Sequence, residues 1–269
     1  MHVLGVVGPE SAVRTATDRL ADRLGEDGRV ATVRRTETAA ESGEESGARV
    51  GTATYELGDE GWTASGRRNK SLSDLLDDLA PEFDYALLAG VPEADAPHVV
   101  VGDADFEGEP LVAVDRADAL DFAEVRAKLD ATQPYETLES LVAEVKRSED
   151  APYSGAIATF TGRVRAKDDL DDDPTEYLEF EAYEGVADER MADLAADLES
   201  REGVYEVAMH HRTGVIEYGE DIVFVVVLAG HREEAFRTVE DGIDRLKDEV
   251  PIFKKEVTTD EQFWVHQRS

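Results

Sequence analysis

The sequence of 269 residues contains no cysteine. This absence excludes disulfide bonds, thiolate metal sites, a cysteine nucleophile and a persulfide carried on the chain. Long apolar runs are also missing, since none approaches the roughly 18 residues that a transmembrane helix needs. The first residues, MHVLGVVGPES, lack a basic leader. We therefore expect no signal peptide, no membrane segment and a cytoplasmic protein.

Positive charge is scarce as well. The chain has 28 Lys+Arg against 62 Asp+Glu, which gives a formal net charge of -34. Such a surface repels nucleic acid and anionic membranes, so we expect neither as a partner. The carboxylates are spread along the whole chain and arginine is preferred over lysine. This pattern indicates a halophilic protein whose self-repulsion is screened by molar salt.

Lysine is the rarer of the two cationic residues, yet three lysines lie around one proline. Lys247, Lys254 and Lys255 flank Pro251 in the stretch IDRLKDEVPIFKKE. Neighbouring cations lower one another's pKa, so an amine among them has a larger neutral fraction and can act as a nucleophile or proton shuttle. Arginine does not deprotonate usefully. The cluster therefore indicates chemistry that needs amines.

Apolar runs and helical patterns alternate in the N-terminal half, which predicts an α/β domain of P-loop type with a parallel sheet. The expected strands and helices are residues 2–8, 11–28, 29–36, 71–83, 85–91 and 98–103. A phosphate-binding loop would follow the first strand, but GPESAVRTAT has no second glycine and no Gly-Lys pair, and Pro9 removes a backbone donor. We expect a scaffold that does not hydrolyse nucleoside triphosphates.

The C-terminal half changes to an α+β pattern, and we place the domains at residues 1–125 and 135–269 with a linker at 126–134. Cations again stand at strand ends: Arg163 and Arg165 close GAIATFTGRVR, and His231 and Arg232 follow DIVFVVVLAG. If these pairs converge with the lysines, they form an anion site. A lone arginine on an acidic surface is more often an ion-pair partner, and His210-His211 are more often core histidines than ligands. No HExxH spacing exists, so we expect no metal site.

Several stretches of the C-terminal half resemble one known family, in order and with little gapping. GAIATFTGRVR, LEFEAYEGVADERM, HHRTGVIEYGEDIVFVVVLAGHREEAF and IDRLKDEVPIFKKEVTTDEQFWV resemble the catalytic (large) subunit of molybdopterin synthase, from about residue 135 to 267. The N-terminal half, in HVLGVVGPES and FDYALLAGVPEADAPHVVVGD, resembles the molybdopterin-guanine dinucleotide biosynthesis adapter family over roughly residues 1–120. Ala89 stands where that adapter family usually carries an acidic residue.

The resemblance to the large subunit implies a function. It implies a sulfurtransferase that converts cyclic pyranopterin monophosphate into molybdopterin. Sulfur would arrive as a thiocarboxylate on the C-terminal Gly-Gly of a ubiquitin-like small subunit, and no further cofactor would be required. The large subunit would form a homodimer with one small subunit at each end, a heterotetramer.

The resemblance also implies roles for individual residues. Lys247 and Lys254 match the family's catalytic lysines. The substrate-binding set matches Arg163, Val164, Arg165, His231, Arg232, Lys247, Lys254, Lys255 and Glu256. Arg163 replaces a more usual lysine, and Phe253 stands where tryptophan is common. Lys247 is expected to activate or position the thiocarboxylate, and Lys254 to assist ring opening or proton transfer.

Two other functional classes remain open from the sequence. One is a nucleotide-binding adapter in which the N-terminal half dominates, although the missing Gly-Lys pair argues against it. The other is a non-enzymatic scaffold for a ubiquitin-like partner in molybdenum cofactor assembly. In that class Lys247 could become joined to the partner's C-terminus through an isopeptide bond.

Overall fold

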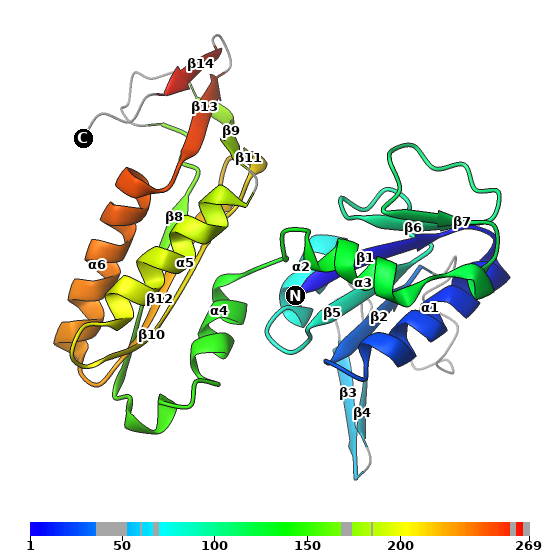
Figure 1. The fold of residues 1–269 in the computed structure, drawn as a ribbon, viewed down its shortest axis with the longest axis horizontal. Coiled ribbons are helices and arrows are strands. Elements are labelled where there is room, and N and C mark those ends of the chain that lie inside the picture. Colours follow the sequence, from blue (N-terminus) through cyan, green and yellow to red (C-terminus); the bar gives the residue numbers. More distant parts are fainter. Residues whose placement is uncertain are drawn as a thin grey trace. The chain divides into compact units, whose positions relative to one another are not determined.

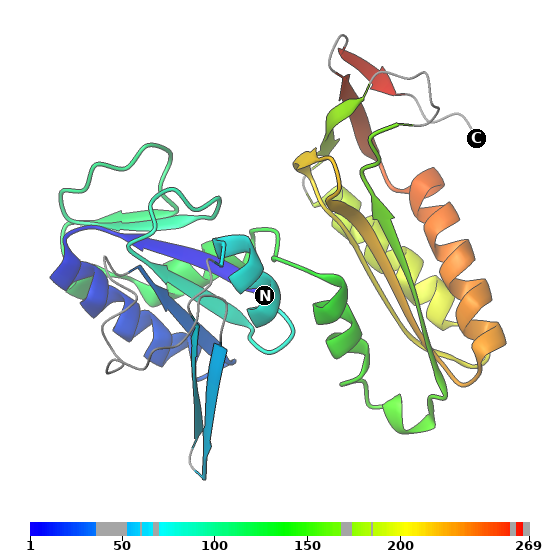
Figure 2. The same ribbon diagram turned by 180° about the vertical axis from the view of Figure 1, so that it is seen from behind.

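The computed structural model describes residues 1–35, 53–59, 61–66, 70–167, 174–183, 185–258 and 262–265. The chain divides into two compact units, Met1–Tyr135 and Glu136–Ser269, which are drawn from two sides in Figures 1 and 2. Helix α3 spans Phe122–Asp130, and its Val125 and Leu129 are buried in the core of the first unit. The first part of the expected linker 126–134 is therefore helical and belongs to the N-terminal unit.

The N-terminal unit contains a five-stranded parallel sheet in the order β2-β5-β1-β6-β7, so the predicted α/β class with a parallel sheet is confirmed. Its strands are β1 (His2–Val7), β2 (Val30–Arg34), β5 (Tyr85–Ala89), β6 (His98–Val101) and β7 (Val112–Val114).

Helices cover both faces of this sheet. Alternate residues of β1 point to opposite sides: Leu4 and Val6 pack with α1 (Glu10–Leu24) and α3, whereas Val3 packs with α2 (Leu72–Leu79). Ser71 caps α2 in a capping box with Asp74, as the serine at the start of this pattern predicts. A short 3₁₀ helix, η1 (Ala117–Ala119), precedes α3.

Glycine in the first strand and turn serves backbone packing. A Cβ on Gly5 would lie 2.2 Å from the ring of His98, a buried side chain whose Nε2 is 3.1 Å from the carbonyl oxygen of Val91. Gly8 has φ +152°, and a Cβ there would lie 2.3 Å from the carbonyl oxygen of Val101. Both positions need glycine for close approach of other chain segments, independently of any phosphate.

Two further strands form an antiparallel ribbon, β3 (Ala53–Gly58) and β4 (Gly61–Gly66). The side chains of Tyr55 and Leu57 on this ribbon are exposed. The polar loop expected at 37–48 lies outside the described residues.

The C-terminal unit is built on two antiparallel sheets, which confirms the predicted α+β class. The first has the order β10-β12-β8, with β8 (Ala156–Arg163), β10 (Val204–His211) and β12 (Asp221–Ala229). The second has the order β11-β9-β13-β14, with β9 (Thr175–Ala182), β11 (Gly214–Glu217), β13 (Ile252–Thr258) and β14 (Gln262–Val265).

Helices lie on both faces of the first of these sheets. Helices α5 (Val186–Glu199) and α6 (Arg232–Glu249) pack on one face, where Val223, Val225 and Val227 of β12 join their core. The alternate residues of β12, including Phe224 and Val226, pack against α4 (Leu138–Val145) on the other face. A 3₁₀ helix, η2 (Ala151–Tyr153), connects α4 to β8. In both units, no helix of the described residues has the length and apolar character to cross a membrane.

Candidate active site

Strand β13 carries the two adjacent lysines of PIFKKE on opposite faces. Lys254 pairs with Phe180 of β9, which is buried in the core, whereas Lys255 pairs with Glu179. Directly paired residues of antiparallel strands share a face, and successive residues alternate. Lys254 and Glu256 therefore lie on the core face of this sheet, and Phe253 and Lys255 on its outer face.

The core-face lysine is held by a short chain of polar contacts. The ammonium of Lys254 lies 3.5 Å from Oε2 of Glu256, and both side chains are largely covered. The hydroxyl of Thr175 donates a hydrogen bond of 2.6 Å to the other carboxylate oxygen, Oε1 of Glu256. Beside them, the ring of Phe180 meets the ring of His211 edge-on, with 4.9 Å between centroids.

The outer-face lysine has a different partner. Lys255 donates a hydrogen bond of 3.0 Å to Glu179, and this bond raises the pKa of Lys255. Next to it, Phe253 is 46% exposed and contacts Tyr183 edge-on. Lys255 is thus a paired, protonated cation on the face away from Lys254.

Lys247 lies in the last turn of α6 and is exposed. Its ammonium is 5.9 Å from the ring centroid of Phe160 in β8, within range of a cation–π interaction. Leu246 and Val250 on either side are buried and anchor this end of the helix.

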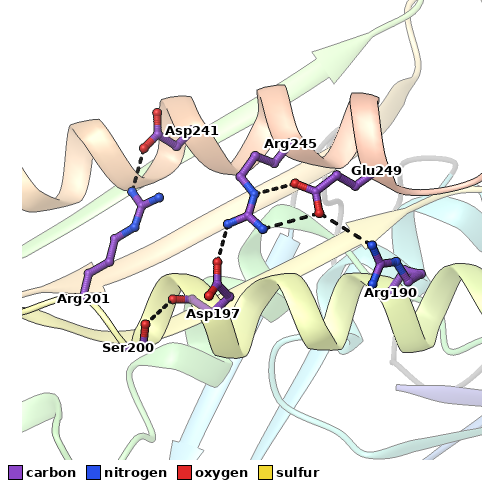
Figure 3. A network of polar contacts seen from close by, with 7 residues as sticks. All are labelled: Arg190, Asp197, Ser200, Arg201, Asp241, Arg245 and Glu249. Atoms are coloured by element: carbon purple, nitrogen blue, oxygen red, sulfur yellow. Dashed lines mark hydrogen bonds and ion pairs between the residues drawn. The ribbon is translucent and has the colours of Figure 1, made fainter.

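A polar network joins α6 to α5 and so fixes the helix that carries Lys247 (Figure 3). Arg245 donates hydrogen bonds of 2.5 Å to Asp197 and 2.6 Å to Glu249, and Arg190 approaches Glu249 from α5. These bonds lower the pKa of Asp197 and of Glu249, and they raise the pKa of Arg245. A second pair, Arg201–Asp241, closes the other end of the helix pair at 2.7 Å.

Arg163, Val164 and Arg165 lie at the end of β8 and just beyond it. Nε of Arg163 is 2.8 Å from Asp221, and its guanidinium also donates to the carbonyl oxygen of Gly219. Val164 is only 2% exposed, and its backbone bonds to the carbonyl oxygen of Glu220 and the N–H of Gly219. Its side chain is thus part of the core, while its backbone fixes the turn. Arg165 is exposed.

His231 and Arg232 lie at the other end of the domain. His231 is the N-cap of α6 and Arg232 its first residue, and both are exposed. The helix has 18 residues, so at 1.5 Å per residue Arg232 and Lys247 are roughly 22 Å apart along it. The expected convergence of Arg163 with His231 is therefore wrong within one chain, because β8 and β12 are antiparallel. Arg163 pairs with Asp221 at the start of β12, and Ala156 with Ala229 at its end.

Three polar residues at this site were not singled out from the sequence: Thr175, Asp221 and Arg212. Arg212 donates to the carbonyl oxygen of Asp221 at 2.9 Å and lies 3.9 Å from Glu220. Arg212 directly follows the histidine pair at the end of β10. The stretch HHRTG therefore shows a cation just past a strand end, the same pattern that points to Arg165 and Arg232. Thr175 has no pattern of its own in the sequence, since it follows the acidic insertion and is recognisable only through its bond to Glu256.

His210 and His211 are both core residues, as the commoner interpretation of this pair predicts. Burial lowers the pKa of each to about 4. They occupy opposite faces of β10, and Nδ1 of His211 lies 2.7 Å from the carbonyl oxygen of Arg212. Within the described ranges, no group of three or more His, Cys, Asp or Glu residues could hold a metal ion.

Comparison with known proteins decides the family. Residues 131–249 match the family model described as MoaE protein. Over 270 residues the chain is 56% identical to the probable molybdopterin synthase of Haloferax volcanii, and the alignment covers all of both chains. The chain belongs to the molybdopterin synthase family. It is therefore an enzyme of molybdopterin biosynthesis.

Other proteins are similar to this chain over about half of its length. The Bacillus subtilis catalytic subunit is 36% identical over 127 residues, covering 47% of this chain and 77% of that protein. The Staphylococcus aureus molybdopterin synthase structure is 32% identical, with a TM-score of 0.44, and covers 51% of this chain and 95% of its own. A MobB protein homolog from Bacillus stearothermophilus is 23% identical, with a TM-score of 0.35, and covers 47% of this chain and 99% of its own.

Proposed function

We propose that this synthase transfers sulfur from a thiocarboxylate to cyclic pyranopterin monophosphate. The sulfur donor is the C-terminal Gly-Gly thiocarboxylate of a ubiquitin-like small subunit. The observation that carries the proposal is the exposed ammonium of Lys247 over Phe160 of β8, the strand that ends at Arg163, together with the covered Lys254–Glu256 pair on β13. Because the chain has no cysteine, it cannot carry the sulfur as a persulfide. In this proposal the partner carries the sulfur, and this chain binds and orients the substrates and moves protons.

The two lysines take different roles in this proposal. Lys247 is exposed at a helix end, so it is accessible to an incoming C-terminus, where its ammonium stabilises the oxyanion that develops on the thiocarboxylate carbon. Lys254 is covered and paired with Glu256, a setting suited to proton transfer during opening of the cyclic phosphate. Arg163 and Arg165 bind the phosphate. Lys255 neutralises the outer face.

A second copy of the chain completes the site. His231 and Arg232 belong to the substrate-binding set but lie at the opposite end of α6 from Lys247. In a two-fold symmetric homodimer, each chain can offer this end to the lysines of the other, and the exchange is reciprocal. With one small subunit bound at each site, the assembly is a heterotetramer.

The test of sulfur transfer is reconstitution at high salt. The protein is mixed with a thiocarboxylated small subunit and cyclic pyranopterin monophosphate, and the dithiolene product is measured as its oxidised fluorescent derivative. We expect product with the intact protein and a loss of about 10²–10⁴-fold in Lys247→Ala. Lys128→Ala, at an exposed lysine of α3 that is not in the substrate-binding set, is the matched control and should retain most activity. Near-full activity of folded Lys247→Ala would refute the role of this lysine.

Co-expression of two inactive variants tests the composite site. Lys247→Ala and Arg232→Ala chains that mix at random form heterodimers with one intact site, so about a quarter of the activity should return. Lys247→Ala with Lys254→Ala should restore nothing, because both residues belong to the same half-site. Absence of recovery in the first mixture, with heterodimers present, would confine the site to one chain.

An amine beside an activated carboxyl can itself be acylated. After the Lys247 ammonium gives a proton to the leaving sulfur, attack of the amine on the thiocarboxylate carbon would form an isopeptide bond and release hydrogen sulfide. Mass spectrometry of the reconstituted complex should then show the partner's C-terminus on Lys247 and not on Lys255. The prediction that no metal or cofactor is required is tested in the same assay, since activity should survive exhaustive chelation.

A further inference from the structure

A β-bulge changes which face the first residue of β9 points to. Val257 of β13 pairs with Tyr177, but the next residue, Thr258, pairs with Thr175, so Glu176 is an extra residue on β9. Paired residues share a face, and Thr258 lies on the same face as Glu256. The bulge therefore turns Thr175 toward the core face, whereas regular alternation would have turned it outward with Tyr177.

Thr175, which the bulge turns to the core face, is buried and contacts Glu256. Thr175 is 7% exposed, and its backbone N–H donates a 2.7 Å bond to the carbonyl oxygen of Ala166. The carbonyl oxygen of Glu176 accepts a 3.1 Å bond from the N–H of Tyr218. The bulge is thus held from both sides, and the hydroxyl of Thr175 is fixed at 2.6 Å from Oε1 of Glu256.

The two carboxylate oxygens of Glu256 contact different residues. Oε1 accepts from Thr175, and Oε2 faces the ammonium of Lys254 at 3.5 Å. Rotation of the carboxylate toward the lysine would break the hydrogen bond from Thr175. The contact of 3.5 Å is longer than a charge-assisted hydrogen bond, which is usually about 2.7–2.9 Å. The ammonium is therefore oriented by Glu256 while its protons stay available to another acceptor.

We propose that Thr175 is a positioning residue of the synthase: it anchors Glu256, and through Glu256 it sets the place of the Lys254 ammonium. This inference rests on the proposed function for its catalytic consequence, but the positioning itself can be measured without turnover. The bulge on β9 is the element that makes it possible.

The first test uses labelling of lysines and needs no substrate. Wild type, Thr175→Val and Thr175→Ser are treated with a limiting amine-acylating reagent, and modification of each lysine is followed by mass spectrometry. Valine keeps the shape but lacks the hydroxyl, so we expect Lys254 to be labelled several-fold faster in Thr175→Val and at the wild-type rate in Thr175→Ser. Lys255, on the other face and paired with Glu179, is the internal control. Unchanged labelling of Lys254 in Thr175→Val would overturn the proposal.

The second test measures turnover in the reconstituted reaction. Loss of a hydrogen bond to a charged group should lower kcat about 10-fold in Thr175→Val with little change in KM, and Thr175→Ser should restore it. In a Glu256→Gln background, the same substitution should add almost nothing, because Thr175 acts through Glu256. A purely structural role would lower the melting temperature and leave kcat per folded chain unchanged. An inactive wild type would refute sulfur transfer and leave the labelling result to decide the role of Thr175.

Discussion

At the scale of single residues, the buried pair His210 and His211 makes stability depend on pH. The pKa of each is lowered from 6.5 to about 4, chiefly by burial. Between these values the unfolded chain binds protons that the folded chain does not, so the free energy of unfolding falls as pH drops from about 6.5 to 4. The difference between the unfolded and folded pKa corresponds to about 3 kcal/mol of unfolding free energy per histidine.

Replacing one of the two should flatten this dependence. His210→Phe keeps an aromatic ring beside Phe224, its partner on β12, but cannot take up a proton. Urea unfolding at several pH values between about 4 and 7 should therefore show a smaller slope of stability against pH. His231→Gln, at an exposed position, is the control for the loss of one histidine. An unchanged slope in His210→Phe would mean that this histidine is already protonated in the folded protein.

A second prediction for a single residue concerns the need for an amine at Lys247. Lys247→Arg preserves the positive charge and its place over Phe160. A guanidinium does not deprotonate and is too broad to take the same position beside a carboxyl carbon. Sulfur transfer in the reconstituted assay should fall about 10²-fold or more, with the melting temperature unchanged. Full activity of Lys247→Arg would reduce the role of this lysine to charge alone.

At the scale of elements, the α5–α6 network predicts a sensitivity to acid. The pKa of Asp197 and Glu249 is lowered by hydrogen bonds from Arg245, so their contribution to stability is present above the usual carboxyl range and lost as pH falls through the lowered values. Arg245→Gln should lower the melting temperature slightly at neutral pH. As pH falls, the melting temperature of this variant should drop less than that of the wild type. Arg237→Gln is the control, because Arg237 pairs with Glu233 within α6. Equal effects of both variants would show that the link between helices contributes nothing.

Elements also show what the sequence can and cannot specify. The apolar runs and the capping serine of α2 were readable because propensity and periodicity act locally. The direction of β12 relative to β8 cannot be predicted in this way, because strand pairing depends on contacts between segments far apart in the chain. This is why Arg163 and His231, each correctly seen at a strand end, were expected together. Resemblance to a family supplied Lys247 and Lys254, whereas the bulge that brings Thr175 to Glu256 leaves no local signal.

At the scale of the whole molecule, each unit has its own core. The residues of the first unit's clusters and those of the second are disjoint. Such chains often unfold in more than one step. Calorimetry should therefore show a transition broader than a single two-state step, and substrate or small subunit should raise only the part assigned to the C-terminal unit. A single two-state transition would show that the units unfold together.

The net charge of -34 gives a second prediction for the whole molecule. Self-repulsion is screened over about 10 Å at 0.1 M salt and about 3 Å at 1 M. The melting temperature should therefore rise with potassium chloride up to molar concentrations. Sucrose at matched water activity is the control and should raise it less, since it does not screen charge. Equal stability in dilute buffer would refute the halophilic interpretation.

The alternation of side chains along β13 limits which insertions and deletions keep the same residues on the core face. Because Lys254 and Lys255 face opposite ways, losing one residue after Pro251 would carry Lys255 into the core-face position that Lys254 leaves. An amine would still stand there, but Glu256 would move to the outer face and lose Thr175. A change of two residues would leave Lys254 and Glu256 on the core face but two positions along the strand, whereas a change of one residue would leave only a lysine on that face.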